Sequence, residues 1–295
     1  MTAELLVNAQ CEVAENPLWH PDEHYLYWTD VPAGRLHRYD LGTDDHECMF
    51  EGESIGGFTL QRNGALLLFM AAGEIKAWCQ DDSPAHVATA SDETETRFND
   101  VVADPVGRVF CGTMPTEDRL GRLYRLDPDG SLTCLLDGVN VSNGLGFSPD
   151  LERFYYTETR ANRIHVFEYD QSTGGIRNQR CFVDWTNNVG VPDGLAVDSE
   201  GFVWSAIWDG GCLVRFAPDG IVDRRYEMPV ARPTSLTFGG EDGRSIFVTT
   251  ARSSDAPPDS PAGGVFVFRL GIRGGPWFRS AVNEADQTSR KCTSD

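Results

Sequence analysis

Residues 104–130, DPVGRVFCGTMPTEDRLGRLYRLDPDG, contain the pattern that decides the fold. A Pro/Gly turn is followed by an apolar strand, a polar loop, a second strand and a Pro-Asp-Gly turn. Pro, Asp and Gly favour turn conformations, whereas β-branched and aromatic residues favour strands. The stretch therefore predicts antiparallel β-structure, and the fold depends on whether it recurs.

The same order of turn, strand and loop recurs along the chain. The units start at His20, Arg62, Asp104, Ser148, Asp198 and Gly239, with turn positions at Pro21, Asn63, Pro105, Pro149, Ser199 and Gly240. Successive turn positions are 42, 42, 44, 50 and 41 residues apart. A period of this length, with about four short strands in each unit, is typical of one propeller blade. The sequence predicts an all-β, six-bladed β-propeller with four antiparallel strands per blade.

The two ends of the chain fall outside the six units. ELLVNAQ (residues 4–10) has no unit of its own, and we expect it to supply the outer strand of the last blade and so close the ring. No linker or change of composition interrupts residues 1–273, which predicts a single domain. From Gly274 the sequence becomes polar, so residues 274–295 are expected to form a loose C-terminal tail.

The charge balance restricts the partners. The chain has 45 acidic and 25 basic residues, a formal net charge of −20, which disfavours nucleic acid and anionic membrane surfaces as partners. Lys76 and Lys291 are the only lysines. An acidic, lysine-poor composition favours a halophilic origin, although arginine in place of lysine also accompanies GC-rich coding. Whether the chain is a monomer or a small homo-oligomer stays open.

Other features of the sequence indicate a cytoplasmic protein. There is no apolar run of about 18 residues and no secretory leader. The eight cysteines are scattered singly, with no CxxC or Cys/His ligand motif, and are expected to be buried and reduced.

A ring of polar residues is predicted at one end of the propeller axis. The first strand of each blade lines the central channel, and each such strand begins six residues before the turn position. The residues at these starts are Glu15, Gly57, Asn99, Asn143, Asp193 and Thr234. A single polar residue there can simply cap a turn. Four carboxylates or carboxamides in one register of a repeat favour a shared site.

The chemistry of this ring favours one divalent metal ion. Without a cation, Glu15 and Asp193 would repel each other and one would have to stay protonated. Two carboxylates with one or two amide oxygens suit Ca²⁺, Mg²⁺ or Mn²⁺, and the donor set does not distinguish these from Zn²⁺ or Fe²⁺. Three protein ligands leave positions open for water or substrate.

Four stretches carry a resemblance to a known family: ENPLW (15–19), RFNDVVADPVGRVFCGTM (97–114), VSNGLGFSPD (141–150) and PDGLAVDSEGFVWSAIWDGG (192–211). In sequence and order they resemble the regucalcin (senescence marker protein)/gluconolactonase family, over about residues 12–270. The resemblance implies a six-bladed propeller with one axial divalent metal that hydrolyses sugar lactones. The look is closest to aldonolactonases of bacterial and archaeal sugar oxidation, acting on xylonolactone, arabinonolactone or gluconolactone.

The resemblance also implies roles for individual residues. Glu15, Asn143 and Asp193 match the metal ligands, and Arg97, Asn99 and Glu117 match substrate-contacting positions. The chain departs from the family at Asn16, where a small residue is usual, and at residues 115–121, a short form of a loop that varies in length and contains Glu117.

The same residues give a hypothesis for catalysis. Asp193 would accept the proton of the attacking water. Asp100 is the second candidate, because it follows Asn99 in a strand and points to the opposite face unless a bulge turns it. Arg97 shares the face of Asn99 and would hold sugar hydroxyls or the developing oxyanion; a salt bridge to Glu95 is the alternative.

Two other functions compete with the lactonase. One is a non-catalytic propeller that binds calcium or another ligand, since YWTD at 27–30 occurs in extracellular receptor propellers, although here it appears once. The other is a related propeller esterase, which would need additional metal ligands. The sequence contains no Gly-x-Ser-x-Gly elbow, P-loop or dinucleotide fingerprint.

Overall fold

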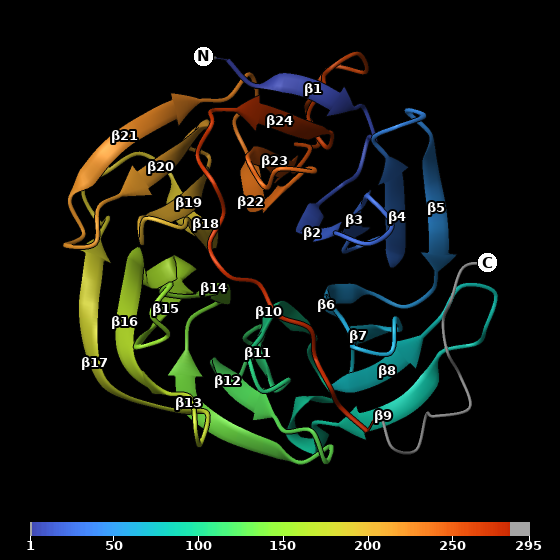
Figure 1. Ribbon diagram of the computed structural model, residues 1–295, viewed down its shortest axis with the longest axis vertical. Helices are drawn as coiled ribbons and strands as arrows, with labels where there is room; N and C mark the ends of the chain where they lie inside the picture. Colours follow the sequence, from blue (N-terminus) through green and yellow to red (C-terminus); the bar gives the residue numbers. More distant parts are fainter. Residues whose placement is uncertain (1, 284–295) are drawn as a thin grey trace.

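The computed structural model describes residues 2–283, which form six four-stranded antiparallel sheets arranged around a central axis (Figure 1). Blade 1 contains β2 (Ala14–His20), β3 (Tyr25–Asp30), β4 (Arg35–Asp40) and β5 (His46–Glu51). Blade 2 contains β6 (Ile55–Leu60), β7 (Leu66–Met70), β8 (Glu74–Trp78) and β9 (Ala85–Thr89). Blade 3 contains β10 (Phe98–Ala103), β11 (Val109–Thr113), β12 (Gly121–Leu126) and β13 (Leu132–Val139).

The second half of the ring repeats this order. Blade 4 contains β14 (Ser142–Phe147), β15 (Arg153–Glu158), β16 (Arg163–Asp170) and β17 (Gly175–Asp184). Blade 5 contains β18 (Val191–Val197), β19 (Val203–Trp208), β20 (Cys212–Phe216) and β21 (Val222–Glu227). Blade 6 contains β22 (Pro233–Gly239), β23 (Ser245–Thr250), β24 (Val265–Arg269) and β1 (Glu4–Val7). Two short 3₁₀ turns, η1 (Ser91–Glu93) and η2 (Thr159–Ala161), lie between strands.

The ring is closed by the N-terminal strand. β1 pairs antiparallel with β24, with Glu4 opposite Val267 and Leu5 opposite Phe266. The last sheet therefore contains strands from both ends of the chain, which removes the free edge that an open array of blades would expose. The predicted six-bladed propeller and its closure by residues near the N-terminus are confirmed.

Apolar side chains fill the spaces between neighbouring blades. Trp19 of blade 1 stacks on Phe247 of blade 6, with ring centroids 5.8 Å apart. Trp28, Trp185 and Trp204 are completely buried within or between sheets. These layers hold the first strand of every blade against its neighbours around the axis, so polar residues at the strand starts are presented in fixed positions.

Each innermost strand begins with a β-bulge. The strand register shifts between Glu15 and Leu18, Ile55 and Gly57, Phe98 and Val101, Asn143 and Leu145, Pro192 and Leu195, and Pro233 and Ser235. A bulge breaks the alternation of side chains between the two faces of a strand. The ring predicted from the repeat is therefore a ring of bulges, in which two consecutive residues of one blade can both lie near the axis.

Residues 274–283, the red segment in Figure 1, cross the axis at the end opposite the ring of bulges. Backbone N–H groups of Gly275 and Ser280 donate to the carbonyl oxygens of Val197 and Leu60, each at 2.9 Å. Val282 is fully buried. The expectation of a loose tail from Gly274 is therefore wrong for residues 274–283, because backbone hydrogen bonds hold a polar segment that composition alone marks as free. Residues 284–295 lie outside the described part of the chain.

The cysteines only partly match the expectation of buried thiols. Among the described residues, Cys11, Cys111 and Cys212 are buried and free, whereas Cys48, Cys134 and Cys181 are exposed and free. Cys79 is disulfide-bonded, so the expectation that every cysteine is reduced does not hold. Within residues 2–283, no helix has the length and apolar character needed to cross a membrane.

Candidate active site on the propeller axis

Glu15, Asn143 and Asp193 come together at the start of β2, β14 and β18. The side-chain N–H of Asn143 donates a short hydrogen bond to Asp193 Oδ1 and a second one, of 3.1 Å, to Thr159 Oγ1. The negative charge of Asp193 is close enough to Glu15 to raise the pKa of that carboxyl. The three residues matched to the family's metal ligands therefore share one end of the axis.

Burial and neighbouring negative charge disfavour the ionisation of the acidic groups at this site. Burial, followed by the charges of Asp193 and Asp100, raises the pKa of Glu15 well above its usual range. Burial and then the charge of Asp100 raise the pKa of Asp193 in the same way, although Asn143 and Arg97 act against the shift. Burial raises the pKa of Asp100 to about 7. Three acidic groups whose ionisation is opposed in this way form a site that a cation would stabilise.

Asn143 provides a separate observation that fits a metal ion. Its amide nitrogen is satisfied twice, but Asn143 Oδ1 is buried and has no hydrogen-bond partner. A buried hydrogen-bond acceptor without a partner costs folding free energy, and a bound ion or water molecule would remove that cost. An amide oxygen beside two carboxylates is a donor set that hard divalent cations prefer. The residues present therefore fit a divalent ion.

The bulge in β10 turns Asp100. The register between β10 and β11 shifts between Phe98 and Val101, and Asn99 and Asp100 are both buried. Asp100 Oδ1 accepts hydrogen bonds from the backbone N–H of Val101 at 3.0 Å and from Asn16 Nδ2 at 3.5 Å. The role predicted for Asp100 required a bulge that turns it toward the axis, and β10 contains such a bulge.

Asn16 connects three blades at this site. It lies in the left-handed region, with φ of 49°, which Asn adopts more readily than most residues. Asn16 Oδ1 accepts the backbone N–H of Phe58 at 2.5 Å, and its Nδ2 donates to Asp100. The sequence marked Asn16 only as a departure from the family. Its role as a support for Asp100 could not be read without the contact between blades.

Arg97 and Asn99 form a hydrogen-bonded pair beside the ring. Arg97 Nη1 donates to Asn99 Oδ1 at 2.7 Å and to the carbonyl oxygen of Phe98 at 2.9 Å. Asn99 Nδ2 donates to the carbonyl oxygen of Ser142 at 2.8 Å. Burial lowers the pKa of Arg97, and the charges of Glu15 and Asp193 act in the opposite direction. The guanidinium is therefore oriented by Asn99, and no ion pair with Glu95 is formed among residues 2–283.

The remaining ring positions are structural. A Cβ on Gly57 would lie 2.9 Å from the carbonyl oxygen of Asn99, and one on Gly144, the residue after ring position Asn143, would lie 2.6 Å from that of Asp193. Glycine therefore lets neighbouring bulges approach closely. Thr234 Oγ1 donates to the carbonyl oxygen of Ala14 at 2.6 Å and so holds β22 against β2.

Glu117 does not join the ring. It is exposed in the loop between β11 and β12, and it makes no hydrogen bond or ion pair with another described residue. Arg119 anchors the loop through a 2.6 Å hydrogen bond to Glu93 Oε2. The loop lies at the ring end of the axis, because strands β10 and β12 start and β11 ends there.

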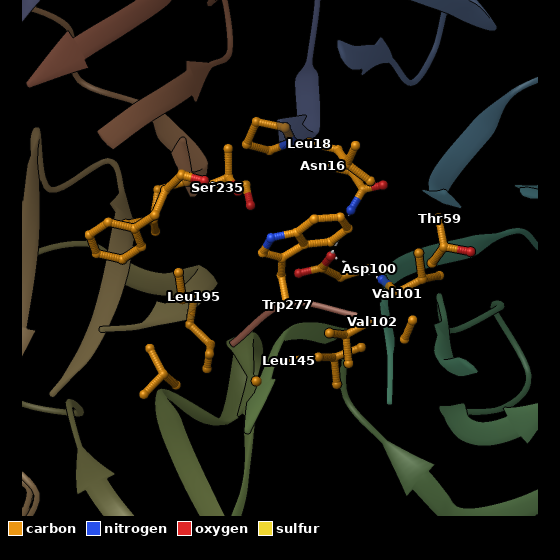
Figure 2. Close-up of a pocket in the computed structure, with 18 of the residues that line it drawn as sticks. Asn16, Leu18, Thr59, Asp100, Val101, Val102, Leu145, Leu195, Ser235 and Trp277 are labelled. Atoms are coloured by element: carbon orange, nitrogen blue, oxygen red, sulfur yellow. Dashed lines mark hydrogen bonds between the residues drawn. The ribbon is translucent and has the colours of Figure 1, made fainter. Parts of the chain in front are cut away.

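A cavity of about 170 Å³ lies on the other side of the ring, along the axis. Figure 2 shows Asn16 and Asp100 directed toward its centre, where the indole of Trp277 from the C-terminal segment projects. The segment thus covers the end of the axis that is remote from Arg97. We expect a substrate to approach from the ring end.

The family described as SMP-30/Gluconolactonase/LRE-like region matches residues 13–252. The chain belongs to this family. The resemblance seen in the sequence is thereby confirmed for the SMP-30/gluconolactonase family as a whole.

Individual members of the SMP-30/gluconolactonase family are similar to this chain over nearly its whole length. The chain is 44% identical to pentonolactonase XacC of Haloferax volcanii, covering 96% of this chain and 99% of that protein. It is 33% identical to 6-deoxy-6-sulfogluconolactonase of Pseudomonas putida, covering 92% and 96% of the two chains. The fold is also that of a calcium-binding regucalcin from Agrobacterium tumefaciens, with a TM-score of 0.87, 23% identity and coverage of 95% and 97%.

Proposed function

We propose that this protein is a metal-dependent lactonase that opens sugar lactones to aldonic acids. The substrates we infer are pentono-1,4-lactones such as xylonolactone or arabinonolactone, or gluconolactone. The observation that carries the proposal is the cluster of half-buried Glu15 with buried Asp100 and Asp193, together with the unpartnered Oδ1 of Asn143, whose side-chain nitrogen contacts Asp193. Similarity to a pentonolactonase and a sulfogluconolactonase supports the reaction class.

Glu15, Asn143 and Asp193 would hold one divalent ion. Their donor atoms are two carboxylates and the unpartnered amide oxygen. A bound divalent ion supplies Lewis-acid polarisation of a carbonyl oxygen and lowers the pKa of a water molecule. The donor set is compatible with Ca²⁺, Mg²⁺, Mn²⁺, Zn²⁺ or Fe²⁺, so we propose the site without choosing among these ions.

The side chains around the site would divide the remaining work. Asp193 Oδ1 is engaged by Asn143, which leaves Oδ2 to accept the proton of the water that attacks the lactone carbonyl. Asp100 is the second candidate for this proton, because it is buried beside Asp193. Arg97, oriented by Asn99, would stabilise the developing oxyanion or bind hydroxyl groups, with Glu117 contacting the sugar from the rim loop. Water adds to the carbonyl carbon, the ring C–O bond breaks, and an aldonate and a proton are released.

A cytoplasmic role in oxidative sugar degradation completes the proposal. A lactone of this class is the product expected from dehydrogenation of an aldose, so such a dehydrogenation would precede this step. Six free thiols among the described cysteines support a reducing compartment, although Cys79 is an exception.

The halophilic origin is supported by the net charge of −20 and the two lysines. Following thermal unfolding against KCl concentration tests it, since salt should raise the stability of a strongly self-repelling acidic protein. Full stability in dilute buffer would contradict a halophilic origin.

Proton release from xylono-, arabinono- and gluconolactone tests the activity. The purified protein is assayed before and after chelator treatment, and after adding back each candidate ion, with enzyme-free lactone as the control for spontaneous opening. We expect turnover that chelator abolishes and at least one ion restores. Turnover of aryl esters alone would favour the related esterase, and metal binding with no turnover would favour the non-catalytic propeller.

A further inference from the structure

A second cluster of metal-ligating side chains lies away from the axis, at the seam where the ring closes. Cys11 belongs to the connector between β1 and β2, Asp30 ends β3, and His37 lies in β4. One ligand atom of each lies within 4.8 Å of the others. The exposed fractions are 1% for Cys11, 5% for Asp30 and 6% for His37. No residue of the axial site takes part.

His37, a member of this cluster, has an unpartnered ring nitrogen. Its Nδ1 is 3.2 Å from Nε2 of His46, whereas its own Nε2 is buried and has no hydrogen-bond partner. Trp28 stacks on the imidazole at 5.4 Å and fixes the ring plane. Burial, and then the neighbouring His46 and Arg35, lower the pKa of His37 to about 4. The imidazole is therefore neutral at pH 7, with one nitrogen oriented by a neighbour and the other free, which is the usual arrangement of a metal-binding histidine.

Asp30 is held in place and keeps coordination capacity. Its Oδ1 accepts the backbone N–H of Val13 at 3.1 Å, and its Oδ2 accepts that of Glu12 at 3.2 Å. Each carboxylate oxygen has a further lone-pair direction available. Within residues 2–283 no ion pair includes Asp30, so the buried carboxylate lacks a directly paired cation.

Cys11 also lies beside an unused donor. The buried indole N–H of Trp28 has no partner with hydrogen-bond geometry, yet it is close enough to the sulfur to favour the thiolate. Burial and the charge of Asp30 outweigh this effect and raise the pKa of Cys11 to about 12. Without a cation the thiol stays protonated. A cation bound to the sulfur would displace that proton and leave Trp28 as an N–H···S donor.

We propose that Cys11, Asp30 and His37 form a second metal site, which binds one Zn²⁺ ion. On binding, the Cys11 S–H bond breaks and its proton passes to solvent, while the sulfur electron pair forms the bond to the ion. The thiolate, the Asp30 carboxylate and the neutral His37 Nε2 together balance the charge of a divalent ion. Sulfur and imidazole donors select Zn²⁺ over Ca²⁺ or Mg²⁺, which take oxygen ligands. The second oxygen of Asp30 provides a fourth donor.

The position of the cluster gives the ion a structural role. The backbone N–H of Cys11 donates to the carbonyl oxygen of Gly263 at 2.9 Å, and Val13 forms a bridge with Ala251 of blade 6. The connector that contains Cys11 therefore joins the last blade to the first. An ion that ties Cys11 to Asp30 and His37 of blade 1 would fasten this seam and stabilise the closed ring.

Titration of the chelator-treated wild-type protein with Co²⁺ tests the site without any substitution. Thiolate ligation gives a sulfur-to-cobalt charge-transfer band in the near ultraviolet and intense visible bands of a tetrahedral ion. The axial site contains only carboxylate and amide oxygens, so it cannot produce the charge-transfer band. We expect the band to saturate at the intensity of one sulfur-bound cobalt ion per chain, with any Co²⁺ taken up by the axial site adding nothing to it, and to disappear on adding Zn²⁺. Absence of the band would overturn the proposal.

Variants with matched controls locate the ligands. Cys11→Ser and His37→Gln should each lose one equivalent of bound zinc after equilibration with Zn²⁺, measured by plasma emission. Cys212→Ser removes another buried free cysteine, and His165→Gln changes a buried histidine of β16, the strand of blade 4 that corresponds to β4. Both controls should keep the zinc content of the wild type and its gain in unfolding temperature on adding Zn²⁺.

Equal zinc content in Cys11→Ser and in the wild type would contradict the proposal. If Cys11→Ser fails to fold, the cobalt spectrum of the wild type decides. Neither readout depends on lactone turnover, so the seam site can fail while the lactonase proposal holds, and the reverse.

Discussion

The axial ring and the seam cluster both bury carboxylates, and they differ in how the charge is balanced. On the axis, burial raises the pKa values of Glu15, Asp100 and Asp193. The charges of Asp193 and Asp100 raise that of Glu15 further, the charge of Asp100 raises that of Asp193, and Arg97 is the cation beside them. At the seam, one carboxylate lies beside a thiol and a neutral imidazole.

The donor atoms differ in the same way. The axial ring offers oxygens contributed by several blades, whereas the seam offers sulfur, nitrogen and oxygen from blade 1 and the connector before it. Oxygen donors with open positions and an excess of negative charge suit a hard ion that must also meet a substrate. A sealed S/N/O set whose two negative charges balance a divalent ion suits an ion that stabilises the fold. Burial alone therefore does not indicate a catalytic site. The two sites differ in the type of donor atom and in access from the ring end of the axis.

The largest expected effect comes from removing Asp193. Asp193→Ala should lower lactone turnover by about 10²–10⁴-fold, because the variant loses both a metal ligand and the proton acceptor. Turnover is measured by proton release, metal content by plasma emission and folding by circular dichroism. The zinc bound at the seam should be unchanged, which separates the two regions. Full activity in this variant would refute the assignment of Asp193.

The second largest expected effect is a pH dependence of the free energy of unfolding, which arises at the axial ring. Burial raises the pKa of Asp100 from 3.8 to about 7, so the folded state binds this proton more tightly than the unfolded state. The contribution of Asp100 to stability should therefore be complete below about pH 4 and be lost as pH rises to about 7, by at most about 4 kcal/mol. Urea unfolding of chelator-treated protein measures the fall.

Asp100→Asn is the matched control, since it removes the titrating proton and keeps the shape. Its stability should fall less steeply over the same interval, and a divalent ion should flatten the wild-type curve. Identical slopes for the two proteins would exclude Asp100 as the cause.

Arg97→Ala should affect substrate use more than metal binding. The guanidinium is oriented by Asn99, and a hydrogen bond to a charged group contributes about 1.5–3 kcal/mol. We expect kcat/KM to fall by about 10–100-fold with metal content unchanged. A metal-free Arg97→Ala protein would show instead that Arg97 maintains the metal ligands.

The smallest effect is expected at Asn16. Asn16→Ala removes the acceptor for the Phe58 N–H and the donor to Asp100. Leaving the buried Phe58 N–H unsatisfied should cost about 1–3 kcal/mol of folding free energy, measured by urea unfolding. Asn16→Gly, which relieves the positive φ but loses the same bonds, separates backbone strain from hydrogen bonding. If both variants match the wild type in stability, the contact between the blades has no energetic weight.

The sequence by itself determined the blade number, the closing strand and the ring register. These features depend on local rules, namely strand periodicity and turn residues, and on a repeat of about 40 residues. The repeated unit occurs six times along the chain. Glu15, Asn143 and Asp193 share one register of that repeat, so their meeting at one end of the axis follows from the repeat.

The tertiary structure alone decided the rest. The bulge that turns Asp100, the contact of Asn16 with Phe58 and the binding of residues 274–283 across the axis depend on hydrogen bonds between segments far apart in the chain. The seam cluster joins Cys11 to His37 across two strands, β2 and β3, and the turns that follow them, with no short spacing that a motif could reveal. Local propensity sets strands and turns, whereas a buried polar contact is set by which distant group completes its hydrogen bonds or charge, and only the packed ring brings those groups together.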